Sequence, residues 1–383
     1  MMKAFLKKGF FLTVLLVPFM ALNAQVKIEN LPDAPGKVIR RHTTVAFLNS
    51  FKVLPAAKVS SLAKAVDKMM DIICQSPHLN PPVGYNAKVN VAASGLGLKE
   101  KEPYVTVNCY LRYLTKDSRY PGIKESLDGA DLYLHINYFG IFSQMGNYWE
   151  DCSNAKFPLF FEEPAITDST NDYIQFNYKG GPVRIVMAGS KPVYVPLTRK
   201  EYVQFLVARD HYRIKEDENT ITDLEKNKKQ THETIANPPV KLNEDVKNAL
   251  TAAIATTDKQ ILQTREEIKK IGEQIEQYQQ FIGAMSPAEA AAPARVDYNK
   301  KGDGYLMGGI GQLVIPGRKE GQLLVKINPS FYDHSAGAPV AQMIVMYDAI
   351  PMLEYRKKPN YLEQAMLDIF DQIDYHALKE SMK

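Results

Sequence analysis

The sequence predicts an α+β fold: a mainly antiparallel sheet body with flanking helices and an inserted, long antiparallel coiled-coil helical hairpin. Two observations support this fold class. Segments rich in β-branched and aromatic residues occur both early and late in the chain, several with alternating apolar and polar positions. Between them lies 198–285, whose polar composition and seven-residue repeat are typical of long paired helices. We therefore expect a body in two parts, 25–197 and 301–383, with the hairpin inserted between them.

The first part of the body should contain a helix followed by strands. Leu62, Met69 and Ile73 recur at helical spacing, which predicts a helix over 59–75. Strand patterns then follow at 87–93, 104–113, 131–142, 173–178, 183–188 and 193–197. In the third of these, apolar residues alternate with polar or aromatic ones. This alternation favours an antiparallel sheet with one solvated face.

The hairpin is the most regular part of the sequence. Thr198 and Glu201 form a capping box, which predicts a helix from there to about His232, and Asn243 should cap a second helix. The second helix carries a seam in alternating steps of four and three: Leu250, Ile254, Thr257, Ile261, Thr264, Ile268, Ile271, Ile275, Tyr278, Ile282 and Met285. Such heptads pack against another helix, and the short joining loop makes the first helix its antiparallel partner.

After the hairpin, the sequence again shows patterns typical of strands. The Ala- and Pro-rich stretch 286–300 is typical of a linker. Strands are predicted at 304–316, 322–328 and 340–349, and an amphipathic helix over 360–381. Because strands occur on both sides of the hairpin, we expect an insertion into one body and not a connection between two independent domains.

The N-terminus predicts export. Lys3, Lys7 and Lys8 precede an apolar run over 9–22, and the small residue Ala24 follows it. This is the pattern of a signal peptide, 1–24, because the run is shorter than the roughly 20 residues that span a bilayer. The remaining chain should then be periplasmic or extracellular, without a transmembrane segment. A retained N-terminal anchor is the alternative.

Composition narrows the classes of partner. A hydrophobic content of 45% and a charged content of 23% are ordinary for a folded globular protein. The net charge is +4, and removal of the three signal-peptide lysines leaves basic and acidic residues nearly balanced. A nearly neutral chain predicts neither a nucleic-acid partner nor attraction to an anionic membrane surface.

The chain has three cysteines, Cys74, Cys109 and Cys152. Export would permit a disulfide, and Cys74 with Cys109 is the candidate pair. Because the number is odd, at least one thiol must stay free or pair with another chain. The alternative is that Cys74 and Cys109 are simply small buried apolar residues.

The sequence carries no metal-binding or cofactor-binding motif, so we expect neither kind of ligand. The weak catalytic candidates are Asp131 and His135, which share one face of a strand, together with Glu162 and Glu163. A secreted hydrolase built on Asp131, His135 and one of the glutamates is one hypothesis. The simpler interpretation of the strand face is a solvated sheet surface.

Aromatic residues near these acids support a second hypothesis, a glycan-binding module. Tyr138, Tyr148 and the single tryptophan, Trp149, would stack on sugar rings, as aromatic side chains do in glycosidases. An ordinary loop is the alternative for this segment.

The hairpin provides the main functional hypothesis. Its first helix is poorer in apolar residues than its second, so part of the second helix's seam would lack a partner and form an apolar stripe. We therefore predict a non-enzymatic envelope or extracellular interaction protein, whose hairpin binds a protein partner or a second copy of the chain. The contact residues would be Ile254, Ile261, Ile268, Ile275 and Ile282. An intramolecular pair that only stiffens the fold is the alternative.

Overall fold

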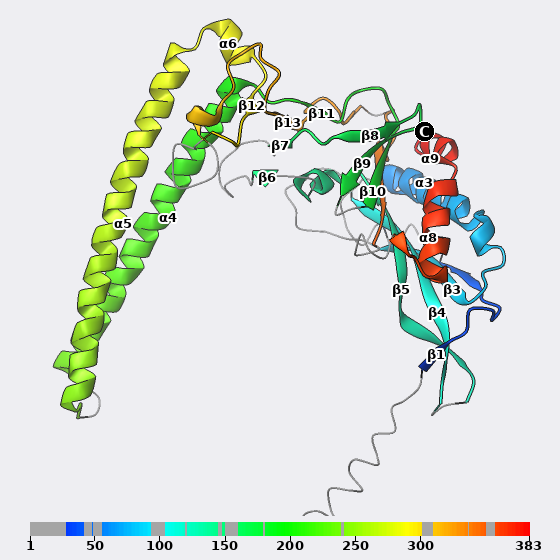
Figure 1. The fold of residues 1–383 in the computed structure, drawn as a ribbon, viewed down its shortest axis with the longest axis horizontal. Helices are drawn as coiled ribbons and strands as arrows, with labels where there is room; N and C mark the ends of the chain where they lie inside the picture. The colour runs from blue at the N-terminus through cyan, green and yellow to red at the C-terminus, as the bar shows by residue number, and fades with distance from the viewer. Residues whose placement is uncertain are drawn as a thin grey trace, which may run out of the picture. The chain divides into compact units, whose positions relative to one another are not determined.

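The computed structural model describes residues 28–41, 48, 56–92, 104–118, 121–144, 148–149, 160–178, 181–238, 241–300, 309–335, 337–349 and 357–383. It confirms the predicted α+β class: a large, mainly antiparallel sheet, flanking helices and two long helices packed together as a hairpin (Figure 1). The chain forms two compact units. Unit 1 comprises the described residues of Met1–Tyr138, Ile166–Gly189 and Ser335–Lys383, and unit 2 those of Phe139–Ala165 and Ser190–His334.

Unit 1 contains a nine-stranded sheet. Its strands are β1 (Ile28–Asn30), β2 (Val38–Arg40), β3 (Tyr85–Ala92), β4 (Val105–Asp117), β5 (Ile123–Ile136), β8 (Ile166–Ser169), β9 (Tyr173–Tyr178), β10 (Gly181–Met187) and β14 (Met343–Asp348). Their order is β2-β3-β4-β5-β14-β10-β9-β8, with β1 paired to β4. Only the β2–β3 pair is parallel among these described strands. The predicted hairpin of 173–178 and 183–188 is confirmed as β9 and β10.

Three helices cover one face of this sheet (Figure 1): α3 (Ala56–Cys74), α8 (Tyr361–Gln372) and α9 (Tyr375–Ser381). The short 3-10 helix η1 (Pro77–Leu79) follows α3. The core lies between helices and sheet because alternate strand residues, such as Leu132, Leu134 and Ile136, point to the helices and are fully buried there.

The predicted single C-terminal helix is wrong in one respect, because the structure breaks it into α8 and α9. Asp374 stands at the break, and its side chain accepts a hydrogen bond from the backbone N–H of Ala377. Arg184 of β10 fixes the end of α8 to the sheet by donating to the carbonyl of Phe370 and to the hydroxyl of Tyr375. The local helical pattern could not show this break, since it is set by contacts with β10.

Unit 2 contains a second sheet of five short strands. These are β6 (Tyr148–Trp149), β7 (Phe160–Glu162), β11 (Tyr194–Pro196), β12 (Arg295–Val296) and β13 (Gln322–Ile327), with the 3-10 helices η2 (Phe139–Gln144) and η3 (Ile310–Gln312). Strand β13 is central and pairs with β7, β11 and β12. The core of the unit gathers Phe160, Leu197 and Leu324 from this sheet region around Tyr202 and Tyr278 of the two long helices.

The hairpin belongs to unit 2 and consists of α4 (Arg199–Ala236) and α5 (Glu244–Ala284). The structure confirms the capping box of Thr198 and Glu201, and the side chain of Asn243 caps α5 by accepting from the N–H of Val246. At 1.5 Å per residue each helix is about 60 Å long. Ion pairs join the helices along the rod, between Lys228 and Asp258 and between Glu225 and Arg265.

Two other segments differ from the sequence-based expectation. The stretch 286–300 contains the short helix α6 (Pro287–Ala291) as well as strand β12, so it contributes to unit 2. Within the described part of 304–316, which starts at 309, helix η3 and an isolated bridge between Leu313 and Val296 replace the predicted strand. The many glycines of this segment disfavour a regular strand, because glycine has no side chain to pack and gains backbone freedom in the unfolded chain.

Candidate functional site

The face of the unit 1 sheet opposite to the helices is polar. Along β4, Val107, Cys109 and Leu111 are fully buried against the helices, so the residues between them point the other way. Those residues and their cross-strand neighbours form what we call the polar face: Asn86, Lys88, Asn90, Thr106, Asn108, Tyr110, Arg112, Glu125, Asp131, Tyr133, His135 and Tyr347.

The strand register arranges the polar face in rows across the sheet. One row runs from Lys88 through Tyr110 to Asp131. The next row runs from Asn90 through Asn108 and Tyr133 to Tyr347 of β14. Directly opposite residues in such rows have Cβ atoms roughly 5 Å apart, so neighbouring side chains interact. The register therefore places residues from distant parts of the chain, such as Asn90 and Tyr347, in one row.

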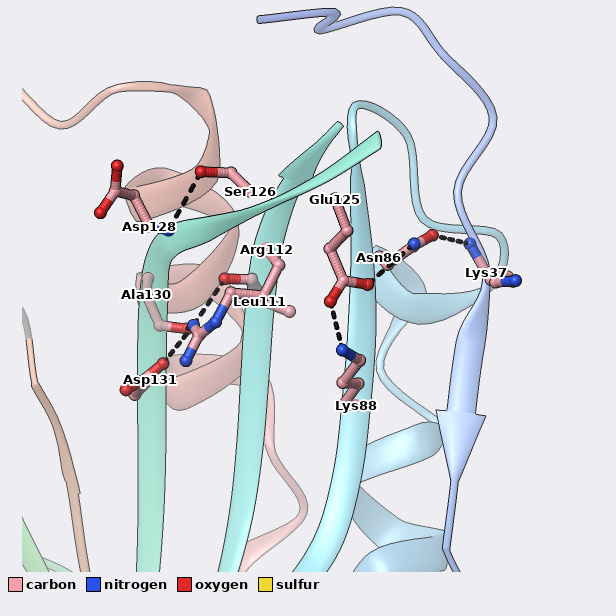
Figure 2. Close-up of polar contacts among 10 residues, drawn as sticks. All are labelled: Lys37, Asn86, Lys88, Leu111, Arg112, Glu125, Ser126, Asp128, Ala130 and Asp131. Carbon is pink, nitrogen blue, oxygen red and sulfur yellow. Dashed lines mark hydrogen bonds and ion pairs between the residues drawn. The ribbon is translucent and has the colours of Figure 1, made fainter. Parts of the chain in front are cut away.

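Arg112 and Asp131 form an ion pair on the polar face (Figure 2). Nη1 of Arg112 also donates to the carbonyl of Leu111, and the Arg112 guanidinium lies 4.9 Å from the ring centre of Tyr110. A Cβ on Gly129 would meet the carbonyl oxygen of Leu111 at 1.8 Å, so only glycine fits here. The close approach of β4 and β5 at this point thus depends on the glycine.

A bulge in β5 lies beside this pair. Arg112 is opposite Gly129 but Leu114 is opposite Glu125, so three residues of β5 face a single residue of β4. The N–H of Asp128 donates to the hydroxyl of Ser126 within the bulge (Figure 2). As bulges do, it redirects side chains.

Past the bulge, Glu125 reaches from β5 across β4 to β3. Its carboxylate pairs with Lys88 and accepts from Nδ2 of Asn86 at 3.0 Å, while Oδ1 of Asn86 accepts from the N–H of Lys37 (Figure 2). Burial alone would raise the pKa of Glu125, but the hydrogen bonds from Lys88 and Asn86 outweigh it and hold that pKa below its ordinary value. Lys88 and Glu125 therefore neutralise one another.

His135 lies in a ring of hydroxyl groups and is only 6% exposed. Its Nδ1 is 2.7 Å from the hydroxyl of Tyr104 and 2.9 Å from that of Thr106, and its Nε2 is 2.9 Å from the hydroxyl of Tyr347. The rings of Tyr133 and Tyr347 stack on the imidazole, with centroids 5.7 and 5.2 Å away. Both ring nitrogens are thus satisfied by hydroxyl groups.

Burial decides the protonation of this cluster. It lowers the pKa of His135 to about 4, because loss of hydration disfavours the charged imidazolium and the hydroxyl groups around the ring carry no charge to offset it. Burial also raises the pKa of Tyr133 and of Tyr347, and the Asp131 carboxylate adds to the effect on Tyr133. At neutral pH the cluster consists of a neutral imidazole among neutral phenols.

The residues of the hydrolase hypothesis belong to both units. Asp131 binds Arg112 and accepts from the hydroxyl of Tyr133, so it is not among the partners of His135. Glu162 ends β7 and Glu163 follows it, and both belong to unit 2. The correct part of the prediction is that Asp131 and His135 lie on one strand face.

The residues of the glycan hypothesis are distributed over both units. Tyr138 belongs to unit 1, where its ring stacks on Tyr104 at 4.8 Å and lies 5.0 Å from His135. Tyr148 and Trp149 form β6 of unit 2, paired with β7, and their side chains lie outside the described residues.

The five isoleucines of the hairpin hypothesis all lie on the side of α5 that faces α4. Ile261 and Ile275 are buried, at 7% and 4% exposure, and Ile254, Ile268 and Ile282 are half-buried. On α4, Ile214, Ile221, Leu224 and Ile235 are half-buried at matching heptad positions. The seam of α5 is therefore covered within the chain by α4.

A charged pair lies where the hairpin leaves the core of unit 2. Arg209 donates from Nε to Oδ1 of Asp210 at 2.7 Å, and both side chains are buried. Burial alone would lower the pKa of Arg209, but the hydrogen bond and charge of Asp210 raise it. The net stability gained from such a pair is small, because both charges lose their hydration on burial.

Cys74 and Cys109 are free thiols in the structure, so the disulfide that the sequence allowed is not formed. Burial raises the pKa of both thiols, which keeps them protonated and unreactive. They match the alternative of small apolar residues, and Cys152 lies outside the described residues.

Among the described residues, no group of three or more His, Cys, Asp or Glu side chains could hold a metal ion. Within the same residues, no helix has both the length and the apolar character needed to cross a bilayer. Comparison with protein-family models, with curated proteins and with solved structures finds no match.

Sequence reasoning missed most of the partners of the polar face. Arg112, Glu125 and Tyr347 stand out only once β4, β5 and β14 are aligned. The one available signal was the alternation in β4, where Thr106, Asn108 and Tyr110 interrupt an apolar series at every second position.

Proposed function

We propose that this chain is an exported, non-enzymatic interaction protein whose helical hairpin reaches another polypeptide. One observation carries the proposal: in α4 every buried side chain lies at or before Asp210, and in α5 only Ile261 is buried before Ile271. We call the described residues 211–270 of these helices the arm. Because the arm buries little apolar surface, it adds little to the stability of unit 2.

The length and surface of the arm support an interaction role. Two long helices held by a single seam form a rod that presents charged and polar outer faces well beyond the core. Leu262 is 60% exposed on the outer face of α5. Since α4 already covers the isoleucine seam, we propose that the isoleucines keep the arm straight and that its outer faces contact the partner.

The signal-peptide pattern of 1–24 supports export, and a protein that acts by contact needs no catalytic centre. The alternative functions have less support. For a hydrolase, the hydroxyl partners of His135 offer no carboxylate to orient it, in contrast to a catalytic triad. For the glycan-binding module, Tyr138 belongs to unit 1, whereas Tyr148 and Trp149 belong to unit 2.

The test compares two forms of residues 25–383 by light scattering. In one form, residues 218–268 are replaced by a short Gly-Ser loop, which keeps Ile271, Ile275 and Tyr278 and so preserves the base of the hairpin. We expect the intact chain to form a dimer or a larger assembly, and the shortened chain to be a folded monomer. Near-UV circular dichroism checks that the shortened chain keeps its core.

Cross-linking of intact and shortened chains in extracts of the producing cell covers a partner other than a second copy. The proposal predicts a cross-linked product that depends on the arm. It is overturned when both forms have the same oligomeric state and the same cross-linked products.

A further inference from the structure

Buried asparagines in this chain usually have partners for both ends of the amide. Oδ1 of Asn86 accepts from the N–H of Lys37 and its Nδ2 donates to Glu125, each at 3.0 Å. Asn137 donates to the carbonyl of Val340 and accepts from the N–H of Gln342. This is the usual pattern, because an unpaired polar atom away from water destabilises the folded state.

Asn90 and Asn108 depart from this pattern. They are directly opposite each other on β3 and β4, in the middle of the polar face. Asn108 is 1% exposed, and Oδ1 of each residue is buried without a hydrogen-bond partner among the described residues. The side chain of Asn108 bonds to Tyr110 but leaves its oxygen unused. The polar face thus holds two neighbouring acceptors that lack donors.

Aromatic rings flank the two acceptors. Tyr133 is the neighbour of Asn108 on β5, and Tyr110 lies one row away on β4. Their rings meet edge to face at 6.5 Å, and both side chains are partly exposed. The Tyr133 hydroxyl donates to Asp131 and its ring stacks on the imidazole of His135, so only the partly exposed remainder of each tyrosine ring is left for a ligand.

The charged groups nearby are already paired. Lys88 is bound to Glu125 and Arg112 to Asp131, which leaves no net charge to attract an anion or a cation. A ligand that suits the polar face is therefore neutral, brings hydrogen-bond donors and has an apolar face. Saccharides have this combination, since their hydroxyl groups donate and their ring C–H groups stack on aromatic rings.

We propose that the polar face binds a neutral carbohydrate, whose hydroxyl groups donate to Oδ1 of Asn90 and Asn108 while its C–H groups pack on the exposed parts of Tyr110 and Tyr133. Because both oxygens are covered in the structure, the side chain of Tyr110 or Tyr133 must change its position before the carbohydrate can reach them. The proposal concerns unit 1 and does not depend on the role of the arm.

The binding test uses residues 25–383 and saturation-transfer NMR. The probes are cellohexaose, chitohexaose, maltohexaose and xylohexaose, with a galacturonic acid hexamer as the charged comparison, all at millimolar concentration. At least one neutral hexamer binds and the acidic one does not. Asn108→Leu weakens that binding by about tenfold or more. Binding of none of the neutral hexamers, or of the acidic one alone, overturns the proposal.

Thermal stability provides the second readout, with Asn86→Leu as the matched control on the same face. Asn108→Leu removes an unused oxygen and one hydrogen bond to the partly exposed Tyr110, so it should leave the Tm unchanged or raise it by up to about 4 °C. Asn86→Leu breaks two hydrogen bonds and should lower the Tm by about 2–4 °C. A fall in Tm for Asn108→Leu as large as that for Asn86→Leu assigns a structural role and overturns the proposal. Asn90→Leu, at a less buried position, repeats both measurements should Asn108→Leu fail to fold.

Discussion

The polar face of unit 1 and the arm of unit 2 both display polar side chains, but water reaches them to very different degrees. Arg112 and Asp131 on the polar face keep about a fifth of their side-chain surface exposed, whereas Glu225 and Arg265 of the arm keep more than half. The charges of an exposed pair keep most of their hydration whether or not the pair forms. The charges of a mostly buried pair have lost that hydration and depend on each other for stabilisation. Removal of one partner of an ion pair should therefore lower the free energy of unfolding strongly in unit 1 and only slightly in the arm.

The largest difference is expected for a matched pair of arginine substitutions. Arg112→Met leaves Asp131 without its cation and should lower the free energy of unfolding by about 3 kcal/mol. Arg265→Met removes only an exposed pair and should cost less than about 1 kcal/mol. Urea denaturation of both variants measures the two values. Equal losses in the free energy of unfolding would show that burial does not determine how much these ion pairs contribute to stability.

A smaller effect is expected from acidification. His135 is neutral in the folded chain, where its pKa is about 4, whereas the unfolded chain takes up a proton near the ordinary value of 6.5. The folded state thus binds fewer protons between these values, so its stability falls as pH falls through this window. The loss between pH 7 and pH 5 should be about 2 kcal/mol.

Urea denaturation at several pH values measures this slope, with His135→Gln as the comparison. Glutamine keeps hydrogen-bonding groups near Tyr104 and Tyr347 but does not titrate, so the variant should lack this part of the slope. A variant with the same pH dependence as the unchanged chain would place the titration elsewhere.

The smallest effect concerns the seam of the arm. Thr264 is half-buried at a seam position, while Thr256 is exposed on the outer face of α5. Thr264→Ile should stabilise the arm by about 0.5–1 kcal/mol through added apolar contact with α4, and Thr256→Ile should have no such benefit. Thermal unfolding followed at 222 nm compares them. Equal effects would mean that the two sides of α5 are not distinct.

The two regions also differ in how far the sequence predicted them. In the hairpin, a capping box, an Asn cap and a seven-residue repeat lie within one continuous segment, so helix bounds and pairing were both predictable. On the polar face, the sequence placed Asp131 and His135 on one side of a strand but suggested a direct functional link between them. In the structure, Asp131 instead forms an ion pair with Arg112. His135 hydrogen-bonds to Tyr104, Thr106 and Tyr347.

The sequence by itself determined the fold class, the hairpin and the alternation of faces along single strands, because periods of 2 and 3.6 residues follow directly from backbone geometry. The tertiary structure alone decided that the strands divide into two sheets, that the last helix breaks at Asp374, and that Asn90 meets Asn108. Those features depend on which strands pair and in which register. Pairing is set by burial between distant segments, and no local pattern records it.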